Sequence, residues 1–415
     1  MRPYFYHLMD LNMGCIADQP IPKWEEYLVP RFPKEATEAV IFFSGDPRKN
    51  AAQFPLLQRE SLVDHDSLER LNTPSPQASS LIDFVPEGLP ARAINLSWPK
   101  WKGLLSTPPR KRKGIRLNLV ALGDVGSTLL IGLCLTGSDC IEEIGIYDRS
   151  PEKQRRFVLE TNQILTFGQS KQTPRVRAIE KEEVFDGDYF VFCASKGIPP
   201  LSQTSGDVRM VQLEGNRKIL KEYAQMARLN NFQGEFCVVS DPVDPLCLSA
   251  YLDSNTYKDH LDYQGLRPEQ IHGFGLGVMY ARAAYLAEST IGDSEFLRHG
   301  RAYGPHGKGL VIANSILAYE EEKSMVLTKA TLHANHLVRE VGFKPYIAPA
   351  LSSGALSILS MIRGNWHLSA NFLGGVYFGA ANQLLDSGVE FERLTLPVPL
   401  MERLKESHHR LEAIL

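Results

Sequence analysis

Between residues 115 and 148 the chain runs through an apolar segment, a glycine-containing turn, a helical pattern and a second apolar segment. The first segment, residues 115–122, leads into Gly123-Asp-Val-Gly126, and the second, residues 144–147, ends at Asp148. Short apolar runs that alternate with longer helical patterns are typical of βαβ units, which build a parallel sheet. This order constrains the fold more than any other feature, and it predicts an α/β fold with a doubly wound parallel sheet.

Three further segments continue the same pattern. Apolar runs at residues 189–194 and 235–240 bracket a helical stretch at residues 216–229. Directly after the apolar run at residues 144–147, Ser150 has the side chain of a helix N-cap and Pro151 suits the first helical position. We therefore expect strands at both runs and a helix that begins at Pro151.

The turn at residues 121–126 carries most of a dinucleotide-binding fingerprint. That fingerprint needs a strand, a glycine turn that lets main-chain N–H groups approach a diphosphate, and an acid about 20 residues further on for the ribose hydroxyls. Here Ala121 replaces the first glycine, Gly123 and Gly126 supply the other two, and Asp148 follows. A strand-to-helix turn without a ligand is the alternative. The strand, helix and acid together favour a Rossmann-type cofactor site.

The acid also bears on which cofactor is bound. A carboxylate at position 148 would repel a 2′-phosphate, so Asp148 favours NAD over NADP, while the adjacent Arg149 argues weakly the other way. We expect NAD.

The rest of the chain suggests an ordinary globular protein with an added N-terminal segment. Residues 1–106 show no long helical period and no repeat, and residues 107–114 combine two prolines, four cations and a glycine. Such a stretch is typical of a solvated linker, although it can also be interpreted as a basic targeting patch. We therefore predict an N-terminal extension at residues 1–106, a linker at 107–114, a Rossmann domain at 115–245 and a mixed α/β substrate domain at 246–415.

Bulk properties point away from several partners. The net charge is −3, with 45 basic and 48 acidic residues interspersed, which gives no general attraction to nucleic acid or to an anionic membrane. The six cysteines show no CxxC spacing, no metal site is suggested, and neither a signal peptide nor a spanning apolar stretch is present. We expect a cytoplasmic protein.

Several blocks, in order over about 300 residues, resemble the lactate/malate dehydrogenase family. Arg209 is followed seven residues later by Asn216, and Ser240-Asp-Pro-Val-Asp244 is similar to the family's Ser-Asn-Pro-Val-Asp. Residues 273–282, which end in Arg282, resemble its Gly-x-x-x-x-Leu-Asp-x-x-Arg helix start. Gly304-Pro-His306-Gly resembles its Gly-Glu-His-Gly, and residues 375–411 resemble its final hairpin and closing helix.

The resemblance implies a role for each matching residue. His306 would be the acid/base that exchanges a proton with the substrate hydroxyl, and a near-neutral imidazole suits both directions of that reaction. Arg282 would bind the substrate carboxylate through two parallel hydrogen bonds, and Arg209 would polarise the carbonyl. Asn216 would contact the substrate. The implied cofactor contacts are Gly123, Asp124, Val125, Gly126, Asp148 and Ala194, and the implied assembly is a homodimer or homotetramer.

The chain departs from the family's pattern at two positions that bear on catalysis. Met279 stands where the family has the aspartate that orients its histidine, and a thioether is a poor hydrogen-bond acceptor. Asp241 stands where the family has an asparagine. We hypothesise that Asp241 has taken over the orientation of His306.

Two other features leave the substrate open. The loop between Ala194 and Arg209 is longer than in ordinary members and has the character of a lid. Small residues in the helical stretch 351–362 would either line the pocket or pack against a second subunit.

The resulting prediction is an NAD-dependent oxidoreductase that interconverts a carboxylate-bearing 2-hydroxy compound and its 2-oxo form. The alternative is a catalytically retired relative that binds the dinucleotide as a structural or sensing ligand. NAD-dependent glycosidases, which hold a metal through cysteine and histidine, would need Cys247 and His306 as ligands, and their motifs fit less well.

Overall fold

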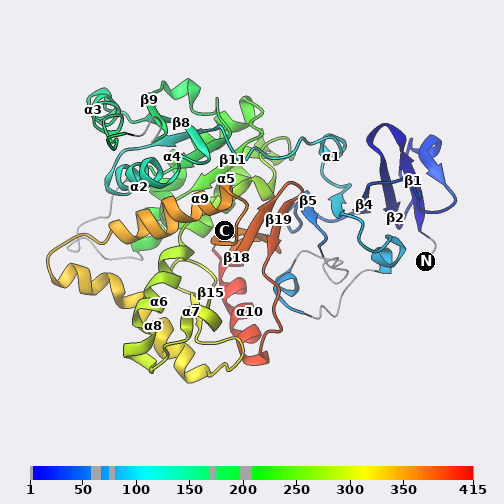
Figure 1. Ribbon diagram of the computed structural model, residues 1–415. Helices are drawn as coiled ribbons and strands as arrows, with labels where there is room; N and C mark the ends of the chain where they lie inside the picture. The colour runs from blue at the N-terminus through cyan, green and yellow to red at the C-terminus, as the bar shows by residue number, and fades with distance from the viewer. Residues whose placement is uncertain (1–2, 58–66, 74–79, 169–172, 197–207, 415) are drawn as a thin grey trace.

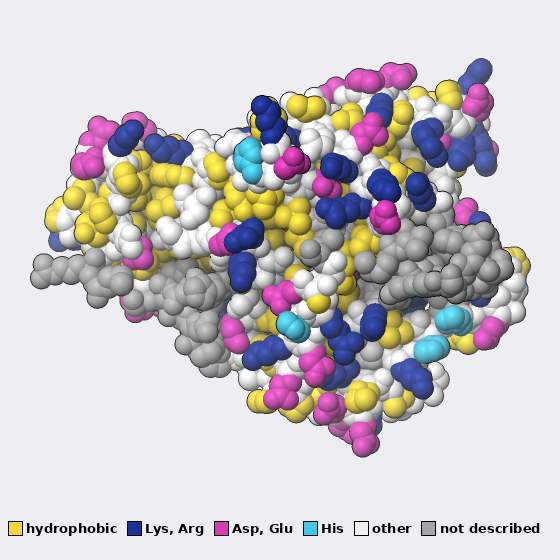
Figure 2. Space-filling view, turned by 180° about the vertical axis from the view of Figure 1, so that it is seen from behind, with side chains coloured by type: hydrophobic (Ala, Val, Ile, Leu, Met, Phe, Trp, Pro, Cys, Tyr) yellow, Lys and Arg dark blue, Asp and Glu magenta, His cyan; other side chains and the backbone are white. Residues whose placement is uncertain are grey.

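The computed structural model describes residues 3–57, 67–73, 80–168, 173–196 and 208–414, with the main chain alone for residue 80 and residues 208–211. Most of the predicted lid loop thus lies outside the described residues. No helix in the described ranges is both long and apolar enough to cross a bilayer. On the face shown in Figure 2, acidic and basic side chains are interspersed.

A nine-stranded sheet forms the centre of the molecule, in the order β19-β18-β17-β14-β11-β10-β7-β8-β9. Its first six strands in sequence are parallel, and their spatial order, third, second, first, fourth, fifth and sixth, is that of a doubly wound Rossmann sheet. The predicted fold class is confirmed. The parallel strands are β7 (Ile115–Val120), β8 (Ile141–Tyr147), β9 (Arg175–Ala178), β10 (Tyr189–Phe192), β11 (Glu235–Val238) and β14 (Ile271–Gly273).

The remaining strands of this sheet come from the C-terminal part and are antiparallel. Strand β17 (His367–Leu373) pairs with β14, β18 (Val376–Leu385) pairs with β17, and β19 (Gly388–Phe391) forms the edge. The predicted final hairpin and closing helix are therefore present, with the helix at α10 (Val398–Glu412). One continuous sheet thus joins the Rossmann half to the C-terminal half.

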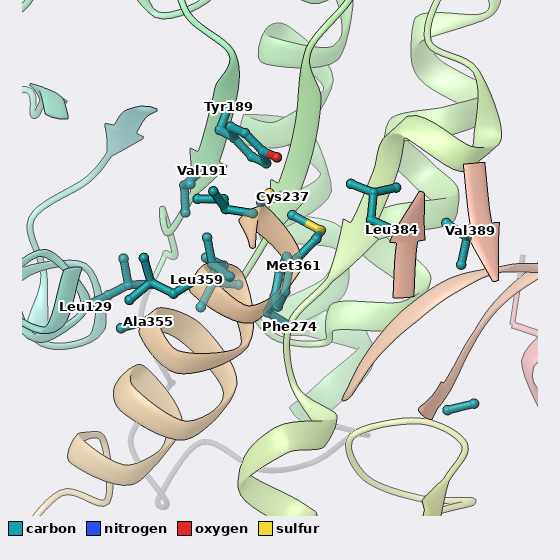
Figure 3. Packing of buried hydrophobic residues seen from close by; sticks show 14 of the residues in the cluster. Leu129, Tyr189, Val191, Cys237, Phe274, Ala355, Leu359, Met361, Leu384 and Val389 are labelled. Atoms are coloured by element: carbon teal, nitrogen blue, oxygen red, sulfur yellow. The ribbon is translucent and has the colours of Figure 1, made fainter. Parts of the chain in front are cut away.

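Helices cover both faces of the parallel strands. Leucines of α2 (Asp124–Thr136) and α9 (Leu356–Ile362) pack on one face, and α4 (Val208–Leu229) and α5 (Val243–Ser254) pack on the other. Figure 3 shows Leu129 and Leu359 meeting below Val191 of β10. The other helical segments are α1 (Trp101–Leu104), α3 (Pro151–Thr161), α6 (Leu276–Ile291), α7 (Phe296–His299), α8 (Glu321–Glu340) and the π-helical η9 (Pro349–Ala355).

Local sequence signals explain where several elements begin. As expected, the Ser150 hydroxyl accepts a hydrogen bond from the Lys153 N–H, and Pro151 is the first residue of α3. Helix α4 covers Val208–Leu229 of the described residues, so it includes eight residues that precede the predicted helical stretch at 216–229.

The N-terminal segment forms a separate six-stranded sheet, at the right of Figure 1. Its core is nevertheless continuous with that of the larger sheet, because Tyr6, Trp24 and Trp98 belong to the same buried cluster as Tyr251 and Phe372. Its strands are β1 (Tyr4–Leu8), β2 (Met13–Ala17), β3 (Leu28–Val29), β4 (Glu38–Phe43), β5 (Gln53–Pro55) and β6 (Ala91–Asn95).

Two small two-stranded sheets lie elsewhere in the chain. One pairs β12 (Thr256–Tyr257) with β13 (His260–Leu261), and the other pairs β15 (Arg301–Tyr303) with β16 (Val311–Ala313).

The expectation of a wholly solvated segment at residues 107–114 is wrong for its arginines. The Arg110 guanidinium is largely buried and forms an ion pair with Glu235 of β11, while Arg112 donates to main-chain oxygens, among them that of Leu384. The pair is extended by His272, whose Nε2 lies 2.8 Å from Glu235 Oε2. The sequence around Arg110 does not indicate that its partner is the buried carboxylate of Glu235, because the two residues are far apart in the chain.

We predict that Arg110→Met destabilises the protein far more than Lys111→Ala. The methionine retains much of the volume but leaves the buried Glu235 carboxylate without its cation, which typically costs about 3–5 kcal/mol. Lys111 pairs with Asp188 at the surface, where such a pair contributes about 0–1 kcal/mol. Urea unfolding followed by circular dichroism measures both, and equal midpoints for the two variants would contradict a structural role for the Arg110 pair.

Candidate active site

The glycine turn after β7 has the close contacts that its sequence implies. Ala121 adopts a left-handed conformation with φ of 75°, so it keeps a glycine-like geometry although it carries a side chain. A Cβ on Gly126 would lie 2.0 Å from the Ala121 oxygen, which excludes any larger residue there. At Gly123 an added Cβ would meet nothing within 4 Å, and no side chain caps the start of α2. The turn therefore presents an open helix N-terminus, where main-chain dipoles favour an anion.

Asp148 lies beside this turn at the end of β8. Its Oδ2 accepts a hydrogen bond from the Leu122 N–H at 2.8 Å, and its Oδ1 accepts one from the Ser150 N–H at 3.0 Å. A carboxylate has about four acceptor positions, so the ribose hydroxyls of a bound cofactor can still be accommodated. Asp148 thus holds the turn in place and remains suited to contact a ribose.

The predicted cofactor residues gather at one edge of the sheet. Ala194 follows β10, whose carboxyl end lies next to that of β7, at the position where the strand order reverses. The Ala194 oxygen accepts a hydrogen bond from the Ser240 hydroxyl, which ties this edge to the end of β11. Asp124 forms an exposed ion pair with Lys344. The open turn, the close contact at Gly126 and the position of Asp148 together fit a dinucleotide.

His306 and Asp241 lie in direct contact, although they are far apart in sequence. His306 Nδ1 is 3.0 Å from Asp241 Oδ1. Burial by itself would lower the pKa of His306, but the charge of Asp241 and this hydrogen bond outweigh it, so the pKa is raised. A carboxylate in this position can fix one ring nitrogen and stabilise an imidazolium, which is the role hypothesised for Asp241.

Arg282 supplies the cation of the site. Its Nη2 donates to Asn335 Oδ1 of α8, and its Nη1 lies 3.5 Å from the Met279 sulfur. Burial lowers the pKa of Arg282, and the charge of Asp241 opposes that effect, which places the two side chains in one electrostatic environment. Met279 is buried among apolar residues and makes no hydrogen bond to His306.

Two further predicted residues are Asn216, which was expected to contact the substrate, and Arg209, which was expected to polarise the carbonyl. The Asn216 side chain is buried: its Nδ2 donates to the Asp241 main-chain oxygen at 2.7 Å, and its Oδ1 accepts from the Lys196 N–H at 2.9 Å. Direct contact with a substrate is therefore a poor description of Asn216, which instead supports the loop that carries Asp241. The side chain of Arg209 lies outside the described residues.

Three residues to which the sequence analysis assigned no role make hydrogen bonds around the candidate site. Asp244 Oδ2 accepts a hydrogen bond from the His306 main-chain N–H at 3.1 Å, and burial raises the pKa of Asp244 to about 7. Ser353 accepts from the Val278 N–H and donates to the Gly275 oxygen, each at 2.8 Å, so it secures the start of α6. Asn335 was missed because its spacing on α8 shows no link to Arg282. Asp244 is the last residue of the motif Ser240-Asp-Pro-Val-Asp244, and this position in a motif was the sequence signal that could have indicated a role for it.

The small residues at 351–362 pack inside the chain. A Cβ on Gly354 would lie 2.6 Å from Leu129 of α2, and Ser353 contacts the start of α6. Gly354 and Ser353 therefore serve packing within one chain, whereas Ser352, Ser357 and Ser360 line a pocket beside Trp366. In the described part of the molecule, no group of three His, Cys, Asp or Glu side chains is arranged to hold a metal ion, and Cys247 is buried.

Comparison with known proteins gives partial sequence matches. No family model matches the chain. An L-lactate dehydrogenase from Staphylococcus epidermidis (strain ATCC 12228 / FDA PCI 1200) is 29% identical over 197 residues, which is 48% of this chain and 56% of that protein. L-lactate dehydrogenase 1 from Staphylococcus aureus (strain MRSA252) is 28% identical over the same length. The chain thus spans little more than half the length of these curated relatives.

Solved structures agree over a larger part of the chain. A minor L-lactate dehydrogenase from Enterococcus mundtii superimposes with a TM-score of 0.60 and 18% identity, covering 73% of this chain and 98% of that one. A malate dehydrogenase from Plasmodium falciparum gives a TM-score of 0.57 and 17% identity, with 72% and 97% covered. At such identities the likeness shows the fold. The chain is therefore similar in part of its sequence to L-lactate dehydrogenases, and it shares the fold of lactate and malate dehydrogenases.

Proposed function

We propose that the protein is an NAD-dependent dehydrogenase that interconverts a 2-hydroxy acid and the corresponding 2-oxo acid. The observation that carries this proposal is the contact between His306 and Asp241, which share an electrostatic environment with the partly buried Arg282 guanidinium. An acid/base and a carboxylate-binding cation in one site are the two groups that the reaction requires. The family relationship supports the same chemistry.

The site residues divide the work in a simple way. Asp241 holds Nδ1 of His306, which leaves Nε2 to give a proton to the carbonyl oxygen during reduction or to take one from the hydroxyl during oxidation. Arg282, oriented by Asn335, would bind the carboxylate through two parallel N–H groups. NAD would accept or supply the hydride. The raised pKa of His306 keeps the proton donor populated near neutral pH.

One observation favours the alternative, a retired enzyme that only binds the dinucleotide. Asp241 replaces a neutral asparagine, and its carboxylate cannot donate a hydrogen bond to a substrate oxygen. The two functions differ in hydride transfer, since both include binding. The loss of NADH absorbance, followed at high protein concentration with each of a panel of 2-oxo acids, distinguishes the two functions. No turnover with any acid would favour the retired enzyme.

We predict that NAD(H) raises the melting temperature and that Asp148→Ala weakens NAD more than NADP. The substitution removes the acceptor for the ribose hydroxyls, which costs NAD affinity, and it also removes the repulsion of a 2′-phosphate. Titration calorimetry with both cofactors measures the difference. Asp139→Ala, which breaks an exposed pair with Arg363 at the other end of α2, is the control. Equal losses for NAD and NADP would show that Asp148 does not contact the ribose.

We predict that Arg282→Lys lowers kcat/KM for a carboxylate substrate by about 10- to 100-fold. A lysine ammonium keeps the charge but cannot make two parallel hydrogen bonds, and a charge-assisted hydrogen bond contributes about 1.5–3 kcal/mol. Steady-state kinetics with the best acid of the panel measures the loss. Arg301→Lys, which changes an arginine paired with Glu392, is the matched control. Intact kinetics in Arg282→Lys would make Arg282 a structural residue.

We predict that Asp241→Asn lowers kcat at least about 100-fold and leaves NAD affinity nearly unchanged. The variant removes the charge that stabilises the imidazolium, and general acid/base catalysis contributes about 100- to 10,000-fold. Reduction needs the protonated ring, so its rate falls as the pH rises through the pKa of His306. Loss of Asp241 lowers this pKa and moves the fall to lower pH.

The pH profile of kcat measures this shift. Asp262→Asn changes a carboxylate that pairs with Arg228 in another part of the chain, and it serves as the control. A harmless Asp241→Asn substitution would contradict the relocation of the family's carboxylate to position 241.

A further inference from the structure

One short segment supplies two contacts to His306. Asp241 and Asp244 lie three residues apart between β11 and the first turn of α5. Asp241 contacts the ring at Nδ1, and Asp244 accepts the main-chain N–H of the same histidine at 3.1 Å. Because both contacts come from one segment, the position of the ring relative to its carboxylate depends on both.

Glycines flank the turn that carries His306. Gly304 has φ of 82° and Gly307 has φ of 155°, so residues without a side chain lie on both sides of Pro305 and the histidine. Main-chain hydrogen bonds from the N–H groups of the two glycines hold the ends of this turn, and the Asp244 contact holds the main chain of His306 itself. Without the Asp244 contact, the main chain at His306 would lose the anchor that keeps the imidazole next to Asp241.

Gly275 provides the space in which the ring lies. A Cβ added to Gly275 would be 2.6 Å from His306 Cβ and 3.0 Å from His306 Nδ1. The main chain of Gly275 has φ of −134° and ψ of −29°, which is not a left-handed conformation. The methyl group of an alanine at this position would meet the side chain of His306.

We propose that Asp244 and Gly275 are positioning residues that hold His306 against Asp241. Asp244 acts as a hydrogen-bond acceptor for the main chain, and Gly275 acts by leaving the space for the ring. This inference rests on the proposed function for its kinetic consequences, while the placement of the ring can be measured without any activity. Burial raises the pKa of Asp244 to about 7, so the ionised carboxylate is unfavourable at this position. A role in anchoring the turn that carries His306 explains why an aspartate stands there.

The kinetic test compares Asp244→Ala with Asp244→Asn. Both variants remove the negative charge, but only the asparagine oxygen can still accept the His306 N–H, so their difference reports the hydrogen bond. We expect kcat to fall at least about 10-fold in the alanine variant and less than about 3-fold in the asparagine variant, with KM and NADH affinity within about 2-fold of wild type in both. Asp253→Ala, which removes another buried carboxylate of α5, is the control and should leave kcat unchanged. Equal losses in the alanine and asparagine variants would overturn the main-chain role.

The second test measures the pKa of His306 by NMR titration. The charged groups that act on His306 are Asp241, Arg282 and Asp244. We expect a lower pKa of His306 in Asp244→Ala than in Asp244→Asn, because only the alanine variant lets the ring leave Asp241. Identical pKa values in the two variants would overturn the proposal, even if the wild type reduces no 2-oxo acid and the proposed function fails.

Gly275→Ala gives an independent test should Asp244→Ala not fold. Its Asp244 contact is intact, and its added methyl group pushes the ring, so we expect the same loss of kcat with an unchanged NADH affinity and a lowered pKa of His306. Wild-type kcat and an unchanged pKa of His306 in a folded Gly275→Ala protein would overturn the role of Gly275.

Discussion

Parallel hydrogen bonding between β7, β10, β11 and β14 is the constraint on which the rest of the structure depends. Strands that run in one direction bring their carboxyl ends to the same edge, so the segments that follow them meet there. The glycine turn follows β7, Ala194 follows β10, Asp241 follows β11 and Gly275 follows β14. The glycine turn, Asp241 and Gly275 thus lie at one edge of the sheet because the strands that precede them are neighbours.

The site arises from side chains that connect these strand ends to the C-terminal half. His306 belongs to a turn after β15, yet the Asp241 ring contact and the Asp244 main-chain contact bind it to the end of β11. Ser353 links η9 to the start of α6, the helix that carries Arg282. The candidate site therefore relies on several long-range polar contacts, among them one from the exposed Asp241 carboxylate.

A second polar cluster stabilises the molecule away from the site. Arg110, Glu235 and His272 join the segment before β7 to the centre of the sheet, and burial lowers the pKa of His272 to about 4, which keeps that ring neutral. The N-terminal sheet shares an apolar core with α5 and β17. Its attachment is therefore part of the same packed structure, and the sequence of residues 1–106 contained no motif that indicated this.

The sequence by itself determined the alternation of strands and helices between residues 115 and 240, the start of α3 at Pro151 and the glycine turn, and it indicated His306 and Arg282 as candidate site residues. These features depend on residue type and short spacing, which govern local conformation and recognisable chemistry. The tertiary structure alone decided that Arg110 is buried, that Asn216 supports a loop, and that Asp244, Ser353 and Asn335 complete the site. The expected contact between Asp241 and His306 also needed the structure, because 65 residues separate them. Such contacts are set by how distant elements pack, and local sequence patterns carry no information on that packing.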